Sequence, residues 1–307
     1  MKVFLCLAIL AACAASPFAK AQEAAAYVVC DATTGHILQQ ENANSKRQVA
    51  SLTKIATAMV ALDWTDLTKR DLGEVVTIPA GADQLPGINS VGLMPGDQAT
   101  LRDLLYSALL QSDNTAAEAI AQHIGSALQD EGLPSDRFVA QMNALARRLG
   151  MKDTRFRNAH GLDSAEDKLP YSTAADMARL TKYAMASSAF RFYVSQKERQ
   201  ISITRAAGTV AGYQLQNTNE LLGVEEIDGV KTGRTRRAGD CVIISSAKSP
   251  ETKQEGDQFI ITPRRLIVVV LGSPSRFPAA KSLLSRGWSD YDQWAANGRP
   301  EKRGRSL

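Results

Sequence analysis

The chain has 307 residues, of which 44% are hydrophobic, and its 36 lysines and arginines nearly balance 32 aspartates and glutamates. This length allows one large domain or two small ones. The balanced charge gives no reason to expect nucleic-acid binding, which usually shows as a basic excess. No stretch after the N-terminal segment approaches the ~20 apolar residues that a membrane-spanning helix needs, so we expect no transmembrane helix in the mature chain.

The first 21 residues have the pattern of an export signal. An apolar run from Val3 to Ala15 is followed by Ala19-Lys20-Ala21, which places small residues where a signal peptidase expects them. We therefore expect a signal peptide at residues 1–21 and a mature protein in the periplasm or cell envelope. The segment Leu10-Ala11-Ala12-Cys13 also resembles a lipoprotein processing box, which leaves lipid attachment at Cys13 as an alternative that equally implies export.

Two cysteines, Cys30 and Cys241, remain after such a cleavage. They could form one disulfide in an oxidising compartment. They could equally be buried as small apolar residues. The sequence leaves both possibilities open.

The hydrophobic pattern predicts strands near both ends of the chain and helices between them. The strands are expected at residues 26–30, 36–38, 75–78, 200–203, 227–232, 241–246 and 266–271. The helices are expected at residues 51–64, 101–109, 116–124, 138–149, 173–186 and 277–294. This order predicts one sheet with helices packed on it and an inserted, mostly helical lobe at about residues 67–195. We expect one domain over residues 22–294 and a basic, disordered tail over residues 295–307.

The start of the helix after residue 50 combines a hydroxyl with an amine. Ser51 and Lys54 are three residues apart, so both fall on one face of the first turn. A serine hydroxyl is a poor nucleophile unless a base takes its proton. A lysine can be that base if burial or a nearby cation lowers its pKa toward neutrality. Alone, however, this short pattern is more typical of a capping serine beside a solvated lysine.

Two further short motifs change this interpretation. Ser112-Asp113-Asn114 interrupts two apolar helices, and Lys231-Thr232-Gly233 lies at the end of an expected strand. Alone, the first is more typical of a helix cap and the second of a turn. The three motifs in this order, however, mark the class A β-lactamases and the penicillin-binding proteins. Together they predict a serine acyl-transfer enzyme.

Three residues are the candidate catalytic groups. Ser51 would attack a carbonyl carbon and become an acyl ester, and Lys54 would accept its proton. Ser112 would relay a proton toward the leaving amine.

Four further residues are candidates for binding the substrate. Asn114 can hold a substrate amide through its carboxamide group. Lys231 would place a cation in the cleft, which would also help to keep Lys54 neutral. Thr232 can bond a substrate carboxylate, and Gly233 allows the substrate backbone to approach the strand edge.

At this point the chain resembles a known family, the D-alanyl-D-alanine carboxypeptidases among the low-molecular-mass penicillin-binding proteins. The resemblance covers about residues 26–288. Besides the three motifs it includes Met94-Pro95-Gly96-Asp97, Leu149-Gly150-Met151, His160-Gly161-Leu162-Asp163, Tyr171-Ser172-Thr173-Ala174, Asp228-Gly229 and Val270-Leu271-Gly272. It implies an α/β fold of the α+β type, like that of β-lactamases and transpeptidases, with an antiparallel sheet flanked by helices.

The resemblance also implies an activity and its site. Peptidoglycan stem peptides that end in D-Ala-D-Ala would be the substrate, and β-lactam antibiotics would acylate the same serine. The backbone N–H groups of Ser51 and Arg234 would form the oxyanion hole, and Arg276 would help to bind the substrate carboxylate. No metal or other cofactor is implied.

Two departures from the family pattern are visible. The family commonly has glycine at the position of Asp113 and often histidine at the position of Arg234.

Three alternative functions remain. Short members of the family include D,D-endopeptidases that cut peptidoglycan crosslinks. A β-lactamase is disfavoured because Glu166 is followed by Leu169 and Pro170, without the asparagine of the β-lactamase pattern. The third alternative is a wall-binding module with an inactive site.

Overall fold

The computed structural model describes residues 24–163, 169–301 and 304–307. Its main sheet is antiparallel, with the strand order β2-β1-β9-β8-β7. These strands are β1 (Ala26–Asp31), β2 (Ile37–Glu41), β7 (Ile227–Thr235), β8 (Gly239–Glu255) and β9 (Gln258–Ser273). The expected hairpin of the first two strands is therefore confirmed, as is the expected central position of the last strand.

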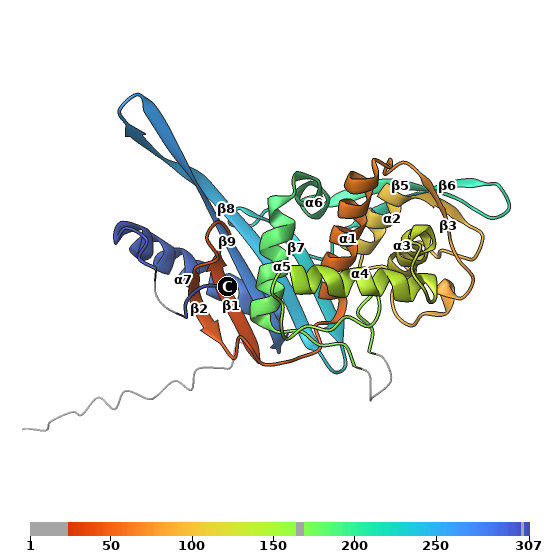
Figure 1. Ribbon diagram of the computed structural model, residues 1–307, viewed down its shortest axis with the longest axis horizontal. Coiled ribbons are helices and arrows are strands. Elements are labelled where there is room, and N and C mark those ends of the chain that lie inside the picture. Colours follow the sequence, from red (N-terminus) through yellow and green to blue (C-terminus); the bar gives the residue numbers. More distant parts are fainter. Residues whose placement is uncertain (1–23, 164–168, 302–303) are drawn as a thin grey trace, which may run out of the picture.

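The alternation of side chains along β9 explains why both faces of this sheet are covered. Ile267, Val269 and Leu271 belong to the core shared with the helical part of the chain. Leu266, Val268 and Val270 point to the opposite face, where they pack with residues of α7 (Arg276–Ala296). Because side chains of a strand alternate between the two faces, a continuous apolar run predicts burial on both. Figure 1 shows α7 and α5 on different sides of the sheet.

The helical part of the chain forms a lobe beside the main sheet (Figure 1). Its helices are α1 (Lys54–Thr68), α2 (Leu101–Leu110), α3 (Asn114–Ala127), α4 (Pro134–Arg148), α5 (Ala174–Ala186) and α6 (Ser188–Val194), with short 3₁₀ turns η1 (Ala50–Thr53) and η2 (Ala82–Gln84). Thr100 caps α2 as expected, since its hydroxyl accepts a hydrogen bond from the Asp103 backbone N–H. The α+β fold class is confirmed.

The expectation of a single sheet was wrong. A second antiparallel sheet has the strand order β3-β4-β5-β6, with β3 (Val75–Thr77), β4 (Gln98–Thr100), β5 (Glu198–Thr204) and β6 (Val210–Gln216). It joins the segment between α1 and α2 to the segment after α6, and β4 contacts β5 through one pairing, Gln98 with Thr204. Because β6 is mostly exposed and such pairing is non-local, the hydrophobic pattern did not predict this sheet.

The expected disordered tail was also wrong for the tail residues that the structure describes. The Ile37 N–H donates to the Arg305 carbonyl, and the Arg305 guanidinium donates to the Leu38 carbonyl. Leu307 donates its backbone N–H to the Gly35 carbonyl at 3.1 Å. The tail thus lies along β2, the edge strand of the main sheet, because that edge offers unpaired backbone groups.

The remaining expectations concern covalent links and the chain start. Cys30 on β1 and Cys241 on β8 are both buried free thiols, so the disulfide alternative is not realised. Within the described residues, no helix has the length and hydropathy of a membrane span. The signal peptide and the alternative lipid attachment at Cys13 lie outside the described residues.

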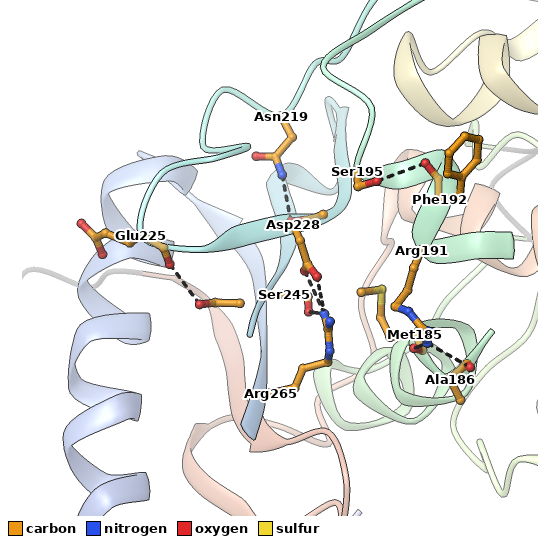
Figure 2. A network of polar contacts seen from close by, with 12 residues as sticks. Met185, Ala186, Arg191, Phe192, Ser195, Asn219, Glu225, Asp228, Ser245 and Arg265 are labelled. Atoms are coloured by element: carbon orange, nitrogen blue, oxygen red, sulfur yellow. Dashed lines mark hydrogen bonds and ion pairs between the residues drawn. The ribbon is translucent and has the colours of Figure 1, made fainter. Parts of the chain in front are cut away.

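A polar network fixes the start of β7, the strand that carries the Lys231 motif (Figure 2). The Arg265 guanidinium on β9 donates to both carboxylate oxygens of Asp228, at 2.8 and 2.7 Å, and to the Ser245 hydroxyl at 2.6 Å. Asn219 donates to the Gly229 carbonyl at 3.0 Å. Hydrogen bonds that join three neighbouring strands hold β7 against the sheet, and the far end of β7 lies beside η1.

Candidate active site

Ser51 lies on the 3₁₀ turn η1, and two glycines allow other segments to reach that turn. A Cβ added at Gly233 on β7 would lie 3.1 Å from the Ser51 backbone nitrogen and 3.2 Å from that of Leu52. A Cβ added at Gly161 would lie 2.0 Å from the Ala50 carbonyl oxygen, and Gly161 also has a φ of +83°. A side chain is therefore excluded at Gly161, and one at Gly233 would require the Ser51 turn to shift by a few tenths of an ångström. Segments far apart in sequence thereby enclose the serine.

The Lys54 amine is fully buried and touches three acceptor atoms. Its Nζ lies 3.0 Å from Ser51 Oγ, 2.7 Å from Asn114 Oδ1 and 2.9 Å from the His160 carbonyl oxygen. Burial lowers the pKa of Lys54 from 10.5 to about 7, while the charge of Asp113 acts in the opposite direction. A neutral amine has two N–H donors and one lone pair. The amide and carbonyl oxygens can take the two donors, which leaves the lone pair for the Ser51 hydroxyl.

His160 contributes through its backbone, and sequence reasoning assigned it no role. Its carbonyl accepts from Lys54, and the neighbouring Ala159 carbonyl accepts from the Thr57 hydroxyl at 2.5 Å. The His160 ring itself is buried, and burial together with the Lys54 charge lowers its pKa to about 3, so the ring is neutral at pH 7. A backbone acceptor leaves no side-chain signature, and only the family-like segment His160-Gly161-Leu162-Asp163 could have indicated this loop.

The Ser112-Asp113-Asn114 motif forms the junction between α2 and α3. Ser112 has a φ of +66° and is 5% exposed. Asp113 caps α3 through a hydrogen bond from the Ala116 N–H, and its second oxygen accepts from the N–H and hydroxyl of Ser90. The motif therefore caps a helix and also brings Asn114 into the site. Asp113 supports the junction, and Asn114 reaches Lys54.

Asn114 was expected to hold a substrate amide, but its carboxamide contacts other groups of the chain. Its Oδ1 accepts from Lys54, and its Nδ2 donates to the Pro86 carbonyl at 2.9 Å. The carboxamide is therefore bonded at both ends within the chain. Ser112, two residues earlier, lies at the same junction, but its hydroxyl forms no hydrogen bond to Ser51 or Lys54 among the described contacts.

Lys231 is buried on β7, two residues before Gly233, which approaches the Ser51 turn. Its amine donates to the Thr232 carbonyl at 3.1 Å, and the Thr232 hydroxyl lies 2.7 Å from that of Thr218. Burial lowers the pKa of Lys231 well below 10.5, and the charges of Lys54 and Arg276 lower it further. The Lys54 charge and the burial of Lys231 thus both disfavour the charged form of the Lys231 amine. The expectation that Lys231 places a cation in the site stays a prediction, and burial shows that such a charge needs a compensating anion.

Arg276 provides the positive charge on this side, since a guanidinium stays protonated. It lies at the start of α7 and donates to the Gly233 carbonyl at 3.2 Å. Asp240 Oδ1 lies 3.8 Å from the Arg276 guanidinium and 3.2 Å from Arg234 Nε. Arg234 is 77% exposed and faces Asp240 across the β7–β8 pairing. Sequence reasoning missed Asp240 because its place depends on that strand register.

Known proteins resemble this chain in sequence and in structure. A family model described as D-alanyl-D-alanine carboxypeptidase matches residues 12–274. D-alanyl-D-alanine carboxypeptidase DacC of Escherichia coli is 31% identical over 280 residues, which cover 88% of this chain but only 62% of that relative. A D-alanyl-D-alanine endopeptidase of Pseudomonas aeruginosa is 32% identical over 252 residues, covering 79% of this chain and 75% of the relative.

Solved structures show the same architecture. The crystal structure of the Streptomyces K15 DD-transpeptidase matches with a TM-score of 0.73 and 28% identity, covering 88% of this chain and 97% of that one. Penicillin-binding protein D2 of Listeria monocytogenes in its ampicillin-bound form matches with a TM-score of 0.67 and 26% identity, over 87% and 97% of the two chains. With the family model matched over most of its length, the chain belongs to the D-alanyl-D-alanine carboxypeptidase family.

Proposed function

We propose that this chain is a serine D,D-peptidase that removes the terminal D-alanine from peptidoglycan stem peptides. The observation that carries the proposal is the contact of 3.0 Å between Lys54 Nζ and Ser51 Oγ, with the amine buried and its pKa lowered to about 7. A buried amine of this kind is a general base at neutral pH. The catalytic domain would comprise residues 22–294, and residues 1–21 would direct its export to the periplasm or cell envelope.

The reaction would begin with proton transfer from the Ser51 hydroxyl to the neutral Lys54 amine. The serine oxygen attacks the carbonyl carbon of the penultimate D-alanine, and the resulting oxyanion accepts hydrogen bonds from the backbone N–H groups of Ser51 and Arg234. The close approach of Gly233 to the Ser51 and Leu52 nitrogens supports this arrangement, since it brings the end of β7 beside the nucleophile.

Breakdown of this intermediate would release the terminal D-alanine. The proton held by Lys54 passes, through the Ser112 hydroxyl, to the leaving amine as the C–N bond breaks. The product is an acyl ester on Ser51. Water then adds to the ester carbonyl, Lys54 takes its proton, and the shortened peptide leaves as the serine hydroxyl is restored.

The substrate carboxylate would bind on the β7 side. Arg276 is held toward this side by its bond to the Gly233 carbonyl, and Thr232 offers a hydroxyl. An arriving carboxylate would raise the pKa of Lys231 and favour its charged form. Penicillin carries both an acylating carbonyl and a carboxylate, so we expect it to acylate Ser51 in the same orientation.

The replacement Ser51→Ala tests the assignment of the nucleophile. We expect the variant to keep its circular dichroism spectrum and its melting temperature and to lose labelling by fluorescent penicillin. Labelling that persists in the folded variant would remove Ser51 from its assigned role. Rapid, repeated turnover of nitrocefin by the native chain would instead favour a β-lactamase, whose proposed Glu166 lies outside the described residues.

Cleavage of crosslinks is the second candidate, because one relative of comparable similarity is named as an endopeptidase. Incubation with purified muropeptides, followed by mass spectrometry, separates the two activities. Loss of one D-alanine from pentapeptide monomers supports the carboxypeptidase. Conversion of crosslinked dimers to monomers supports the endopeptidase. No turnover, with penicillin labelling absent as well, would favour the wall-binding module with an inactive site.

A further inference from the structure

An open pocket of about 390 Å³ lies between α4 and the extended segment that follows it, outside the candidate active site. One wall is a stripe of α4 that includes Asp136, Asn143 and Arg147, which are seven and four residues apart and therefore share a face of the helix. The other wall is formed by Arg155, Phe156 and Arg157. Three guanidinium groups and one carboxylate thus surround a single pocket.

The backbone beneath two of these arginines is fixed. Asn143 is 7% exposed, and its carboxamide donates to the Phe156 carbonyl and accepts from the Phe156 N–H, both at 3.0 Å. Arg155 and Tyr171 exchange backbone hydrogen bonds at 2.8 and 3.1 Å. Since alternate residues of an extended segment point the same way, Arg155 and Arg157 project together on either side of the buried Phe156. The backbone that carries these two arginines is therefore fixed before any ligand binds.

The three arginines are unpaired within the described part of the chain. The side chains of Arg147, Arg155 and Arg157 form no ion pair or hydrogen bond with another described residue. The adjacent Arg148, in contrast, lies 2.9 Å from Asp63, and Arg179 lies 2.8 Å from Asp176. Like charges that face one pocket repel one another, and an anion in the pocket would relieve that repulsion.

The segment continues directly into the loop that contacts the candidate base. Asn158 closes a turn by accepting from the Gly161 N–H at 2.6 Å, and the His160 carbonyl accepts from Lys54. The pocket is therefore connected to the catalytic loop by a few ordered residues. A long substrate that occupies the cleft would have further anionic groups available for a second contact.

From these observations we propose that the Arg147–Arg155–Arg157 pocket binds a carboxylate of the peptidoglycan polymer, away from the peptide being cleaved. This inference rests on the proposed function, which makes stem peptides the substrate. Neighbouring stem peptides on one polymer carry their own carboxylates, and a bidentate guanidinium suits such a group. The pocket would hold the enzyme on the wall and would not take part in acylation.

A cosedimentation experiment with purified peptidoglycan sacculi tests this proposal. The protein is first acylated with penicillin, so that the cleft is occupied and only additional contacts are measured. The triple variant Arg147→Ser, Arg155→Ser, Arg157→Ser should bind about tenfold more weakly than the native chain, as expected from three partly exposed charge contacts. Added salt should weaken the native chain more than the variant.

A matched variant controls for net charge. Lys69→Ser, Arg102→Ser, Lys253→Ser removes three exposed cations that lie outside the pocket, and it should bind like the native chain. Native-like binding by the pocket variant, or an equal loss in the control variant, would overturn the proposal. A preference of the native chain for anionic phosphatidylglycerol vesicles over sacculi would also overturn it. Absence of penicillin labelling in the native chain would instead reject the proposed function, so the two failures are distinguishable.

Discussion

The two buried lysines of the candidate site differ in how their amines are satisfied. Lys54, on the helical side, contacts Ser51 Oγ, Asn114 Oδ1 and the His160 carbonyl. Lys231, on the strand side, donates within the described residues to one backbone carbonyl, that of Thr232. Burial lowers the pKa of both amines. The same residue type therefore occupies two unlike environments within one candidate site.

This difference indicates two separate tasks. An amine with a complete set of partners is held in one orientation, as a general base must be. A buried amine with one acceptor still has donors to offer, and an incoming carboxylate would satisfy them. The helical side is thus prepared for proton transfer before the substrate arrives. The strand side becomes fully satisfied only when an anion binds.

The largest expected effect is that of removing the base. The replacement Lys54→Met keeps the volume and burial of the side chain but removes the lone pair that faces Ser51. We expect the rate of acylation by penicillin to fall by about 10²–10⁴-fold, the usual contribution of a general base. Stopped-flow measurement of acylation checks this, with a melting curve to verify folding. A loss below about tenfold would assign proton transfer to another group.

A smaller and more selective effect is expected on the strand side. Lys231→Met should reduce kcat/KM for a carboxylate-bearing peptide by about 10–100-fold, since a hydrogen bond between charged groups contributes about 1.5–3 kcal/mol. A matched peptide with a methyl ester at its C-terminus should lose little. Equal losses for the two peptides would show that Lys231 does not recognise the carboxylate.

The same variant should differ from Lys54→Met in its ligand-free stability. Removing a buried amine that has one acceptor relieves a desolvation cost, so the melting temperature of Lys231→Met should equal or exceed that of the native chain. Lys54→Met leaves the Asn114 and His160 oxygens without a donor and should melt at a lower temperature. The opposite order would contradict the contrast between the two lysines.

The smallest effect is expected at the network that anchors β7. Asp228→Ala removes the acceptor of the Arg265 guanidinium, and we expect a loss of about 1–2 kcal/mol in the free energy of unfolding. Urea denaturation measures this loss. Asp257→Ala, an exposed carboxylate at the end of the β8–β9 hairpin, is the matched control and should change stability by less than about 0.5 kcal/mol. Equal effects would show that the network does not stabilise the strand.

The sequence was informative where chemistry is local. The spacing of Ser51 and Lys54 predicted their proximity, and the three motifs together predicted which segments meet. The apolar run of β9 predicted its central place because burial on both faces requires such a pattern.

What the sequence could not show depends on backbone groups and on pairing between distant segments. The His160 carbonyl is a partner of Lys54, yet any residue type offers that atom. Asp240 reaches Arg234 through the β7–β8 register, and β6 pairs with β5 despite its exposed pattern. The lowered pKa of Lys231 follows from burial, which residue type alone does not reveal.

The pH dependence of penicillin acylation tests the central claim most directly, namely that a neutral Lys54 amine deprotonates Ser51. Because the pKa of Lys54 is lowered to about 7, the amine loses its proton as the pH rises through that value. We predict that the acylation rate of the native chain rises with pH, with a midpoint near 7. The Lys54→Met variant should lack this pH-dependent rise. A rate that stays low until the pH approaches 10, the range of an ordinary lysine, would contradict the account.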